Sequence, residues 1–187
     1  MHGLLLEAPE GDSLKSVRDR AILATLLFHA LRRHELCDLN VEDFTLRNGI
    51  THLTIHGKGG KIRYVPVHPQ ATRLIEDYLE MAGHGADWAG PLFRPVRNNR
   101  TGTLLKPLHP NSVYQTIVLH YGKKAGIGFP GYRTHSMRST AATNALEHGA
   151  DIQEVREWLG HSDVSTTQLY DKRKHRTENS PSFKVRY

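Results

Sequence analysis

Several basic side chains stand where they could act together on a phosphate. His135 and Arg138 are three residues apart, so on a helix both project from one face and converge on one ligand. Guanidinium groups with imidazole donors suit a phosphodiester that must gain negative charge without a metal ion. Taken singly, each residue has an ordinary structural explanation, but their combination favours a catalytic site that acts on a phosphate. The candidates are Arg32, Lys58, His135, Arg138 and His161.

Other kinds of catalytic site find little support in the sequence. Thirteen histidines invite a metal site, but there is no HExxH motif and no Cys/His knuckle, so no metal ion and no cofactor are expected. There is no GxSxG motif, and Ser136 and Ser139 lie in a helical pattern, which argues against a serine hydrolase. The segment GKGG at 57–60 lacks the spacing of a phosphate-binding loop and reads as a turn that carries a lysine.

The elements that position these residues are mostly helical. Helical spacing of apolar residues predicts a core helix over 16–30, with Ser16 and Asp19 resembling a capping box, and a short second helix over 31–39. The alternating runs ITHLTIH and KIRYVPVH predict a β-hairpin, and TLRNG supplies a third strand and a tight turn. Pro69 is suited to start another helix.

The second half of the chain is expected to be irregular and then helical. Residues 83–107 are rich in Gly, Pro and Asn and predict a long irregular connection. Four short helices follow, in HPNSVYQTIVLHYGKKAG, HSMRSTAATNALEHG, DIQEVREWLG and DVSTTQLYD. The fold class predicted is therefore α+β, mostly helical, with one small three-stranded antiparallel sheet.

Composition limits the cellular setting and the partner. The 187 residues suit one compact domain, the N-terminus lacks the features of a signal peptide, and Cys37 is expected to be a small buried hydrophobe, which together favour the cytoplasm. The net charge of +6 and a pI of about 9.5 favour a polyanionic partner, with nucleic acid the leading candidate. The basic segment DKRKHRTENSPSFKVRY either contacts DNA or is a solvated tail.

Four segments together resemble the motif blocks of one enzyme family. ALRRHEL, HGKGGKIRYVPV, THSMRSTAAT and HGADIQEVREWLGHSDVSTTQLY are similar to successive motifs of the tyrosine recombinases, or phage integrases, in particular the bacterial Xer-type and integron-type members. The resemblance runs from about Ser16 to Tyr170. A chain that holds LGHS, then STTxxY, together with HxxR matches this family very specifically.

The resemblance implies a role for each candidate residue. Arg32 would be the first catalytic arginine and Lys58 the hairpin lysine. His135 and Arg138 would be the HxxR pair. His161 would be the late histidine and Tyr170 the nucleophile. The neighbouring candidates for DNA contact are Arg33, Lys61, Arg63 and Arg133. Because Arg32 and Arg33 are adjacent, a shift of one residue in the match to the family motif would make Arg33 the phosphate ligand in place of Arg32.

The resemblance also implies an activity and partners. It implies a site-specific recombinase that cleaves and rejoins double-stranded DNA through a 3′-phosphotyrosyl intermediate and a Holliday junction, without metal or ATP. The protein would be a monomer when free and a homotetramer on DNA. Two alternatives remain open at this point: DNA relaxation of the type IB topoisomerase kind, and a DNA-binding regulatory fragment without catalysis.

Departures from the family pattern concern one glycine and the domain organisation. Ala30 stands where a glycine usually precedes the Leu-Arg pair. We expect a linker remnant at 1–15, a catalytic domain at 16–171 and a basic C-terminal tail at 172–187 that could dock between subunits. The N-terminal core-binding domain that family members usually carry is expected to be absent.

Overall fold

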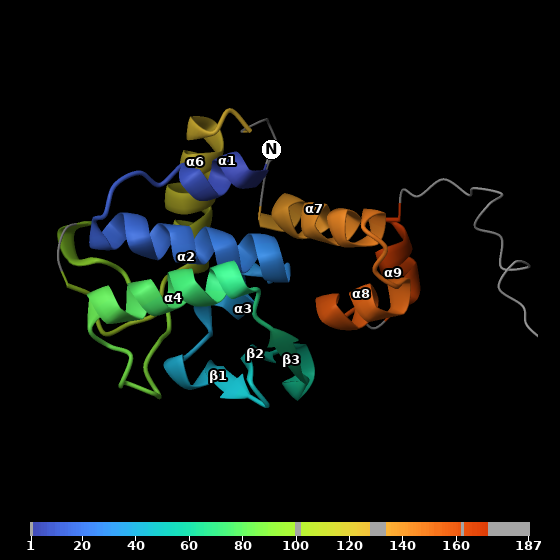
Figure 1. The fold of residues 1–187 in the computed structure, drawn as a ribbon, viewed down its shortest axis with the longest axis horizontal. Helices are drawn as coiled ribbons and strands as arrows, with labels where there is room; N and C mark the ends of the chain where they lie inside the picture. The colour runs from blue at the N-terminus through green and yellow to red at the C-terminus, as the bar shows by residue number, and fades with distance from the viewer. Residues whose placement is uncertain (1, 100–101, 128–133, 162, 172–187) are drawn as a thin grey trace, which may run out of the picture.

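The computed structural model describes residues 2–99, 102–127, 134–161 and 163–171 (Figure 1). The helices are α1 (His2–Glu7), α2 (Leu14–His29), α3 (Arg33–Cys37), α4 (Pro69–Ala82), α5 (Pro110–Ser112), α6 (His120–Lys124), α7 (Thr134–Glu147), α8 (Ile152–Leu159) and α9 (Val164–Gln168). The strands are β1 (Phe44–Arg47), β2 (Ile50–His56) and β3 (Ile62–Pro66), and a π-helical segment, Val113–Leu119, joins α5 to α6. The predicted α+β class is confirmed.

Helix α2 forms the centre of the molecule, with α4 packed along it and α1 and α7 against other parts of its surface (Figure 1). Its residues 21–27 are apolar except for Thr25 and are all buried, which is the pattern of a helical segment buried on every side. The cap predicted at Ser16 is wrong. The N-cap is Ser13, whose hydroxyl accepts from the amide of Ser16, while Asp19 is buried inside the helix and receives bonds from other side chains.

The three-stranded antiparallel sheet has the order β1-β2-β3, as the sequence predicts. Asn48 and Gly49 form the turn between β1 and β2, and both have positive φ, as a two-residue hairpin turn requires. Phe44 pairs with Leu53, and Leu53 pairs with Val65 on the next strand. Leu53 and Val65 are buried, so this face of the sheet joins the core and the hairpin is held in a fixed register.

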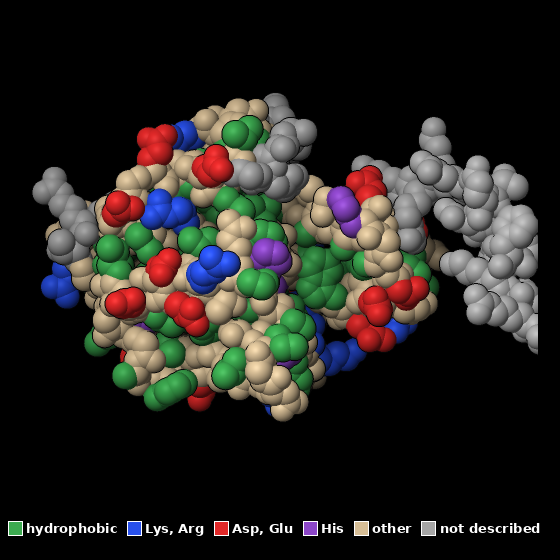
Figure 2. Space-filling model, in the orientation of Figure 1, with side chains coloured by type: hydrophobic (Ala, Val, Ile, Leu, Met, Phe, Trp, Pro, Cys, Tyr) green, Lys and Arg blue, Asp and Glu red, His purple; other side chains and the backbone are tan. Residues whose placement is uncertain are grey.

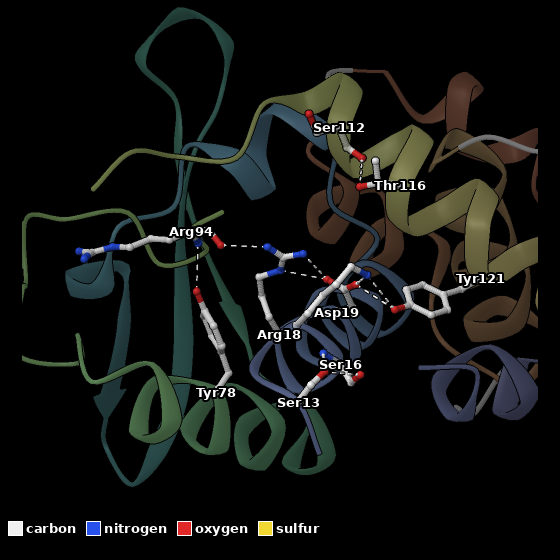
Figure 3. A network of polar contacts seen from close by, with 10 residues as sticks. Ser13, Ser16, Arg18, Asp19, Tyr78, Arg94, Ser112, Thr116 and Tyr121 are labelled. Carbon is white, nitrogen blue, oxygen red and sulfur yellow. Dashed lines mark hydrogen bonds and ion pairs between the residues drawn. The ribbon is translucent and has the colours of Figure 1, made fainter. Parts of the chain in front are cut away.

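A buried polar network anchors the irregular segment 83–107 to the central helix (Figure 3). Arg18 of α2 donates to the carbonyl oxygen of Arg94, and the amide of Arg94 donates to the hydroxyl of Tyr78 on α4. Asp19 accepts from Arg18 and from the hydroxyl of Tyr121 on α6. Arg94 therefore fixes this segment to α2 and α4, and Asp19 ties the same part of α2 to α6.

Helices α7, α8 and α9 form a lobe beside the end of α2 (Figure 1). Its small core contains Ala142 and Leu146 of α7 with Val155 and Leu159 of α8, together with Ala30 directly after α2. Among the described residues, no helix is long and apolar enough to span a bilayer. Cys37 is buried as predicted, and burial raises the pKa of its thiol to about 12.

Candidate active site

Arg32 is the N-cap of α3 and lies in the turn that joins α2 to α3. Helix α2 ends at His29, and Ala30 then adopts a left-handed conformation with φ of 51°. The sequence predicted a second helix over 31–39, whereas in the structure the helix begins at Arg33 and Arg32 is the N-cap. Its Nη1 donates to Oε1 of Glu35 at 2.8 Å, and its backbone amide donates to Oε2 at 2.8 Å.

Glu35 holds a second arginine as well, and the sequence analysis missed this role. Arg63 donates from Nη1 and Nη2 to the two carboxylate oxygens, at 3.1 and 2.9 Å. Burial alone would raise the pKa of Glu35, but the hydrogen bonds from Arg63 and Arg32 lower it to about 2. The signal in the sequence was a glutamate three residues after Arg32, the spacing at which a side chain reaches back to a helix start.

Arg63 connects the hairpin to the end of α8. Its side chain, on β3, is 16% exposed because Glu35 occupies its guanidinium group. Gly160 lies against the same group, and a Cβ at this position would stand 3.2 Å from Nη1 of Arg63. The hairpin, α3 and the turn before His161 therefore meet at one side chain.

The HxxR pair lies on α7, as predicted, but its two members differ in burial. Arg138 is buried and donates to the carbonyl oxygens of Ala30 and Leu159, which fixes the guanidinium group between α2 and α8. Burial and the nearby charge of Arg32 lower the pKa of Arg138 to about 10, so it remains charged at neutral pH. His135 is exposed, and it shares with Arg138 a cavity of about 410 Å³.

The same cavity brings the first arginine to the HxxR pair. Arg32 and Arg33 both line it, together with Tyr114. The Arg33 guanidinium lies over the Tyr114 ring, 5.6 Å from its centroid, whereas the charge of Arg32 lowers the pKa of both Arg138 and His161. This geometry supports Arg32 as the residue that acts beside Arg138.

His161 follows the C-cap of α8 and lies among the arginines. Its Nδ1 is 3.0 Å from the hydroxyl of Thr167 on α9. Burial and the charges of Arg138, Arg32, His135 and Arg63 lower the pKa of His161 to about 4. The ring is therefore neutral at pH 7, with one nitrogen that donates and one that accepts.

Tyr170 is folded against its own domain. It stands in the turn after α9, where its amide donates to the carbonyl oxygen of Thr167 at 3.0 Å. Its ring packs on the small core of the α7–α9 lobe, with its centroid 6.1 Å from that of His161. The phenol is also close enough to Arg138 for the two charges to interact.

The remaining predicted residues are on or near the hairpin, with one exception. Lys58 begins the short 3₁₀ turn Lys58–Gly60 between β2 and β3, and Gly59 in this turn has φ of 76°. Lys61 follows the turn and is exposed. Arg133 lies outside the described residues. Among the described residues, no group of three or more His, Cys, Asp or Glu side chains is placed to hold a metal ion.

The arrangement can bind an anion and activate a phenol. Two guanidinium groups provide fixed positive charge, and a neutral imidazole provides a hydrogen-bond donor. A positive charge near a tyrosine favours the phenolate form over the phenol. These are the requirements of a tyrosine that attacks a phosphodiester.

Comparison with known proteins identifies the family. The model of the phage integrase family matches residues 3–176. The tyrosine recombinase XerC of Pelobacter propionicus is 39% identical over 166 residues, which are 89% of this chain and 51% of that protein. The tyrosine recombinase XerD of Yersinia pestis is 36% identical over 174 residues, 89% of this chain and 53% of that protein.

Solved structures agree with this assignment. The XerH site-specific recombinase in a pre-cleavage complex with its difH substrate has a TM-score of 0.73 at 25% identity, over 95% of this chain and 50% of that one. The XerA recombinase has a TM-score of 0.72 at 27% identity, over 100% of this chain and 64% of that one. The chain spans about half the length of the curated relatives it matches. By its sequence, fold and motifs, the chain belongs to the phage integrase family.

Proposed function

We propose that this chain is the catalytic part of a site-specific tyrosine recombinase that cleaves and rejoins double-stranded DNA. The observation that carries the proposal is the position of Tyr170, whose ring centroid lies 6.1 Å from that of His161, close to buried Arg138. The comparisons support it, because XerC and XerD relatives are named as tyrosine recombinases. The catalytic unit would comprise residues 16–171.

In the first step, the Tyr170 oxygen attacks the scissile phosphorus and forms a 3′-phosphotyrosyl bond while the bond to the 5′-oxygen breaks. A free tyrosine has a pKa of about 10, so attack needs a base or nearby positive charge. Arg138 supplies this charge, and the exposed His135 accepts the phenolic proton.

The arginines stabilise the charge that develops on the phosphorus oxygens. Arg138 is held by two carbonyl oxygens and Arg32 by Glu35, so both guanidinium groups are oriented before DNA binds. Loss of one preorganised donor of this kind typically costs about a hundred- to a thousandfold in rate. His161, neutral at pH 7, donates a further hydrogen bond to a phosphate oxygen.

Departure of the 5′-oxygen requires a proton, and Lys58 provides it. Lys58 starts the turn that joins β2 to β3, and the hairpin is fastened to Glu35 through Arg63. The phosphotyrosyl bond conserves the free energy of the broken bond, so an incoming 5′-hydroxyl reseals the strand without ATP. Arg33, Lys61, Arg63 and Arg133 remain candidate DNA contacts, and Lys61 is exposed beside the turn.

Strand exchange between two duplexes requires assembly, for which we propose four protomers on DNA. Two adjoining cavities flank the end of α2: residues of α1, α2, α4 and α7 line one of about 990 Å³, and residues of α2, α7 and α8 line one of about 360 Å³. They share Leu27 and Phe28, and Figure 2 shows acidic side chains on the adjacent lobe. Glu147 and Glu154 line them, which suits the basic residues 172–187 of a neighbouring protomer.

A covalent trapping experiment tests the proposed function. The chain is incubated with nicked duplexes that cover the DNA flanking its gene, because departure of a short fragment from such a substrate prevents resealing. We expect a covalent protein–DNA adduct at one mapped site, formed equally well with and without EDTA. Vigorous relaxation of supercoiled DNA that lacks any special site, without recombination between two copies of the mapped site, would contradict the proposal.

A further inference from the structure

Thr167 is buried in α9 and contacts the ring of His161. Its exposed fraction is 0%, while its neighbour Thr166 is exposed. Among the described residues, the hydrogen-bond partner of its hydroxyl is Nδ1 of His161, at 3.0 Å.

This hydrogen bond can be formed in either direction, and burial of the hydroxyl favours the one in which the threonine donates. A hydroxyl that is buried without an acceptor for its proton costs about 1 to 3 kcal/mol, and within the described part of the chain Nδ1 of His161 is the acceptor that it contacts. A neutral imidazole that accepts at Nδ1 carries its own proton on Nε2. The His161 ring is neutral at pH 7, because burial and the charges of Arg138, Arg32, His135 and Arg63 lower its pKa.

We propose that Thr167 is a positioning residue that donates its hydroxyl proton to Nδ1 of His161 and so keeps the Nε2–H tautomer, which donates to the scissile phosphate. This inference rests on the proposed function for the identity of the phosphate. The opposite tautomer would present a lone pair to an anion at Nε2, and the ring would then repel the group that it should bind.

The same residue also sets the position of the nucleophile. The carbonyl oxygen of Thr167 accepts the amide of Tyr170 at 3.0 Å, while its side chain holds His161. The ring centroids of His161 and Tyr170 are 6.1 Å apart. One buried threonine thus fixes the donor and the nucleophile relative to each other, although they are nine residues apart.

The test combines a tautomer measurement with a cleavage rate in Thr167→Val, Thr167→Ser and the matched control Thr166→Val. Ring nitrogen signals of His161 are read by long-range ¹H–¹⁵N correlation in the DNA-free chain at pH 7 and are assigned with His161→Gln. Wild type, Thr167→Ser and Thr166→Val should show the proton on Nε2. Thr167→Val, which keeps the shape but removes the hydroxyl, should show loss of this preference.

The cleavage rate of the nicked substrate should fall when His161 loses its preference for a proton on Nε2. We expect Thr167→Val to cleave about tenfold more slowly, the loss of roughly one hydrogen bond, with DNA affinity within about twofold of wild type. Thr167→Ser should restore the rate, which a role in packing alone would not do. Melting temperatures identify any variant that is unfolded.

Two outcomes separate failure of the inference from failure of the proposed function. If folded Thr167→Val keeps the wild-type tautomer, or the wild type carries the proton on Nδ1, the inference is wrong whatever the cleavage rates. If the tautomer responds as expected but the wild type never forms a covalent adduct, the assignment of the hydrogen bond is supported and the proposed function is overturned.

Discussion

Glu35 is the residue on which the placement of the arginines depends most. Its carboxylate receives three side-chain hydrogen bonds, one from Arg32 and two from Arg63, and it is 7% exposed. Removing one member of a buried ion pair leaves its partners buried and unpaired, which typically costs about 3 to 5 kcal/mol. Arg32 has a half-exposed side chain and can move into water, whereas Arg63 cannot.

We therefore predict that Glu35→Gln lowers the free energy of unfolding by about 3 kcal/mol and slows cleavage by at least about a hundredfold. The amide keeps the shape but cannot neutralise two guanidinium groups. Urea unfolding and the nicked-substrate assay measure the two effects. Glu42→Gln changes an exposed glutamate nearby and serves as the control. A Glu35→Gln variant as stable and as active as wild type would show that the carboxylate holds neither arginine.

At the scale of elements, the junction of α2 and α4 depends on a buried histidine at the end of α2. His29 is 1% exposed, its Nδ1 donates to the carbonyl oxygen of Thr25 at 3.0 Å, and its Nε2 accepts the amide of His68 at 3.0 Å. Burial and the nearby His68 lower the pKa of His29 to about 4 from an ordinary value of 6.5. Protonation of Nε2 would place its N–H against the amide N–H of His68, and two donors would then face each other without an acceptor.

This arrangement predicts loss of stability in mild acid. Between pH 6.5 and about 4 the unfolded chain binds a proton at His29 that the folded chain does not, so stability is full above 6.5 and falls through this window. The shift corresponds to at most about 3 kcal/mol. His161 titrates in the same window, so wild type is compared with His29→Gln and with exposed His148→Gln.

Thermal unfolding at pH 7.5 and pH 4.5 measures the effect. The difference in melting temperature between the two pH values should shrink in His29→Gln and stay unchanged in His148→Gln. An equal difference in all three proteins would mean that the His68 amide does not depend on a neutral His29.

Much of the fold and most of the site follow from local patterns in the sequence. The Asn48-Gly49 turn, the hairpin and the helix after Pro69 each have a strong local signal, and the structure has all three. The position of the cap at Ser13 was not predicted, because Asp19 has the right spacing for a capping box but is recruited by Arg18 and Tyr121.

Contacts between distant segments were beyond prediction from the sequence. The pairing of Glu35 with Arg63 joins residues 28 positions apart, and the left-handed conformation of Ala30 occurs in a residue type that rarely adopts it. The sequence could name Arg63 only as a candidate DNA contact and could not show its ion pair with Glu35, because an exposed basic residue and a buried ion-pair partner look the same in a sequence. Burial and partner choice are tertiary properties.

At the scale of the whole molecule, the net charge of +6 predicts that binding to the proposed DNA substrate depends on salt concentration. Each basic side chain that contacts a phosphate releases a counterion, so affinity falls as salt concentration rises. Six to ten such contacts would lower affinity by about 10³- to 10⁵-fold between 50 and 200 mM salt. Titration of a labelled duplex by fluorescence anisotropy at several salt concentrations measures this slope.

Removal of a single exposed lysine that contacts a phosphate should change the slope of log affinity against log salt concentration by a measurable amount. We predict that Lys61→Ala, beside the hairpin turn, reduces the slope of log affinity against log salt by about one, whatever the DNA sequence. Lys124→Ala is the matched control, because Lys124 is already paired with Glu10 at 3.1 Å. Equal slopes for wild type and Lys61→Ala would exclude Lys61 from the phosphate contacts.

The central claim is that the residues around Arg138 activate Tyr170 as a covalent nucleophile. The most direct measurement traps the adduct on a nicked duplex, digests the protein and maps by mass spectrometry the peptide that carries the nucleotide. We predict that the label is on Tyr170, that Tyr170→Phe forms no adduct while binding DNA within about twofold of wild type, and that Tyr64→Phe behaves as wild type. An adduct that survives Tyr170→Phe, or a label on any other residue, would contradict the account.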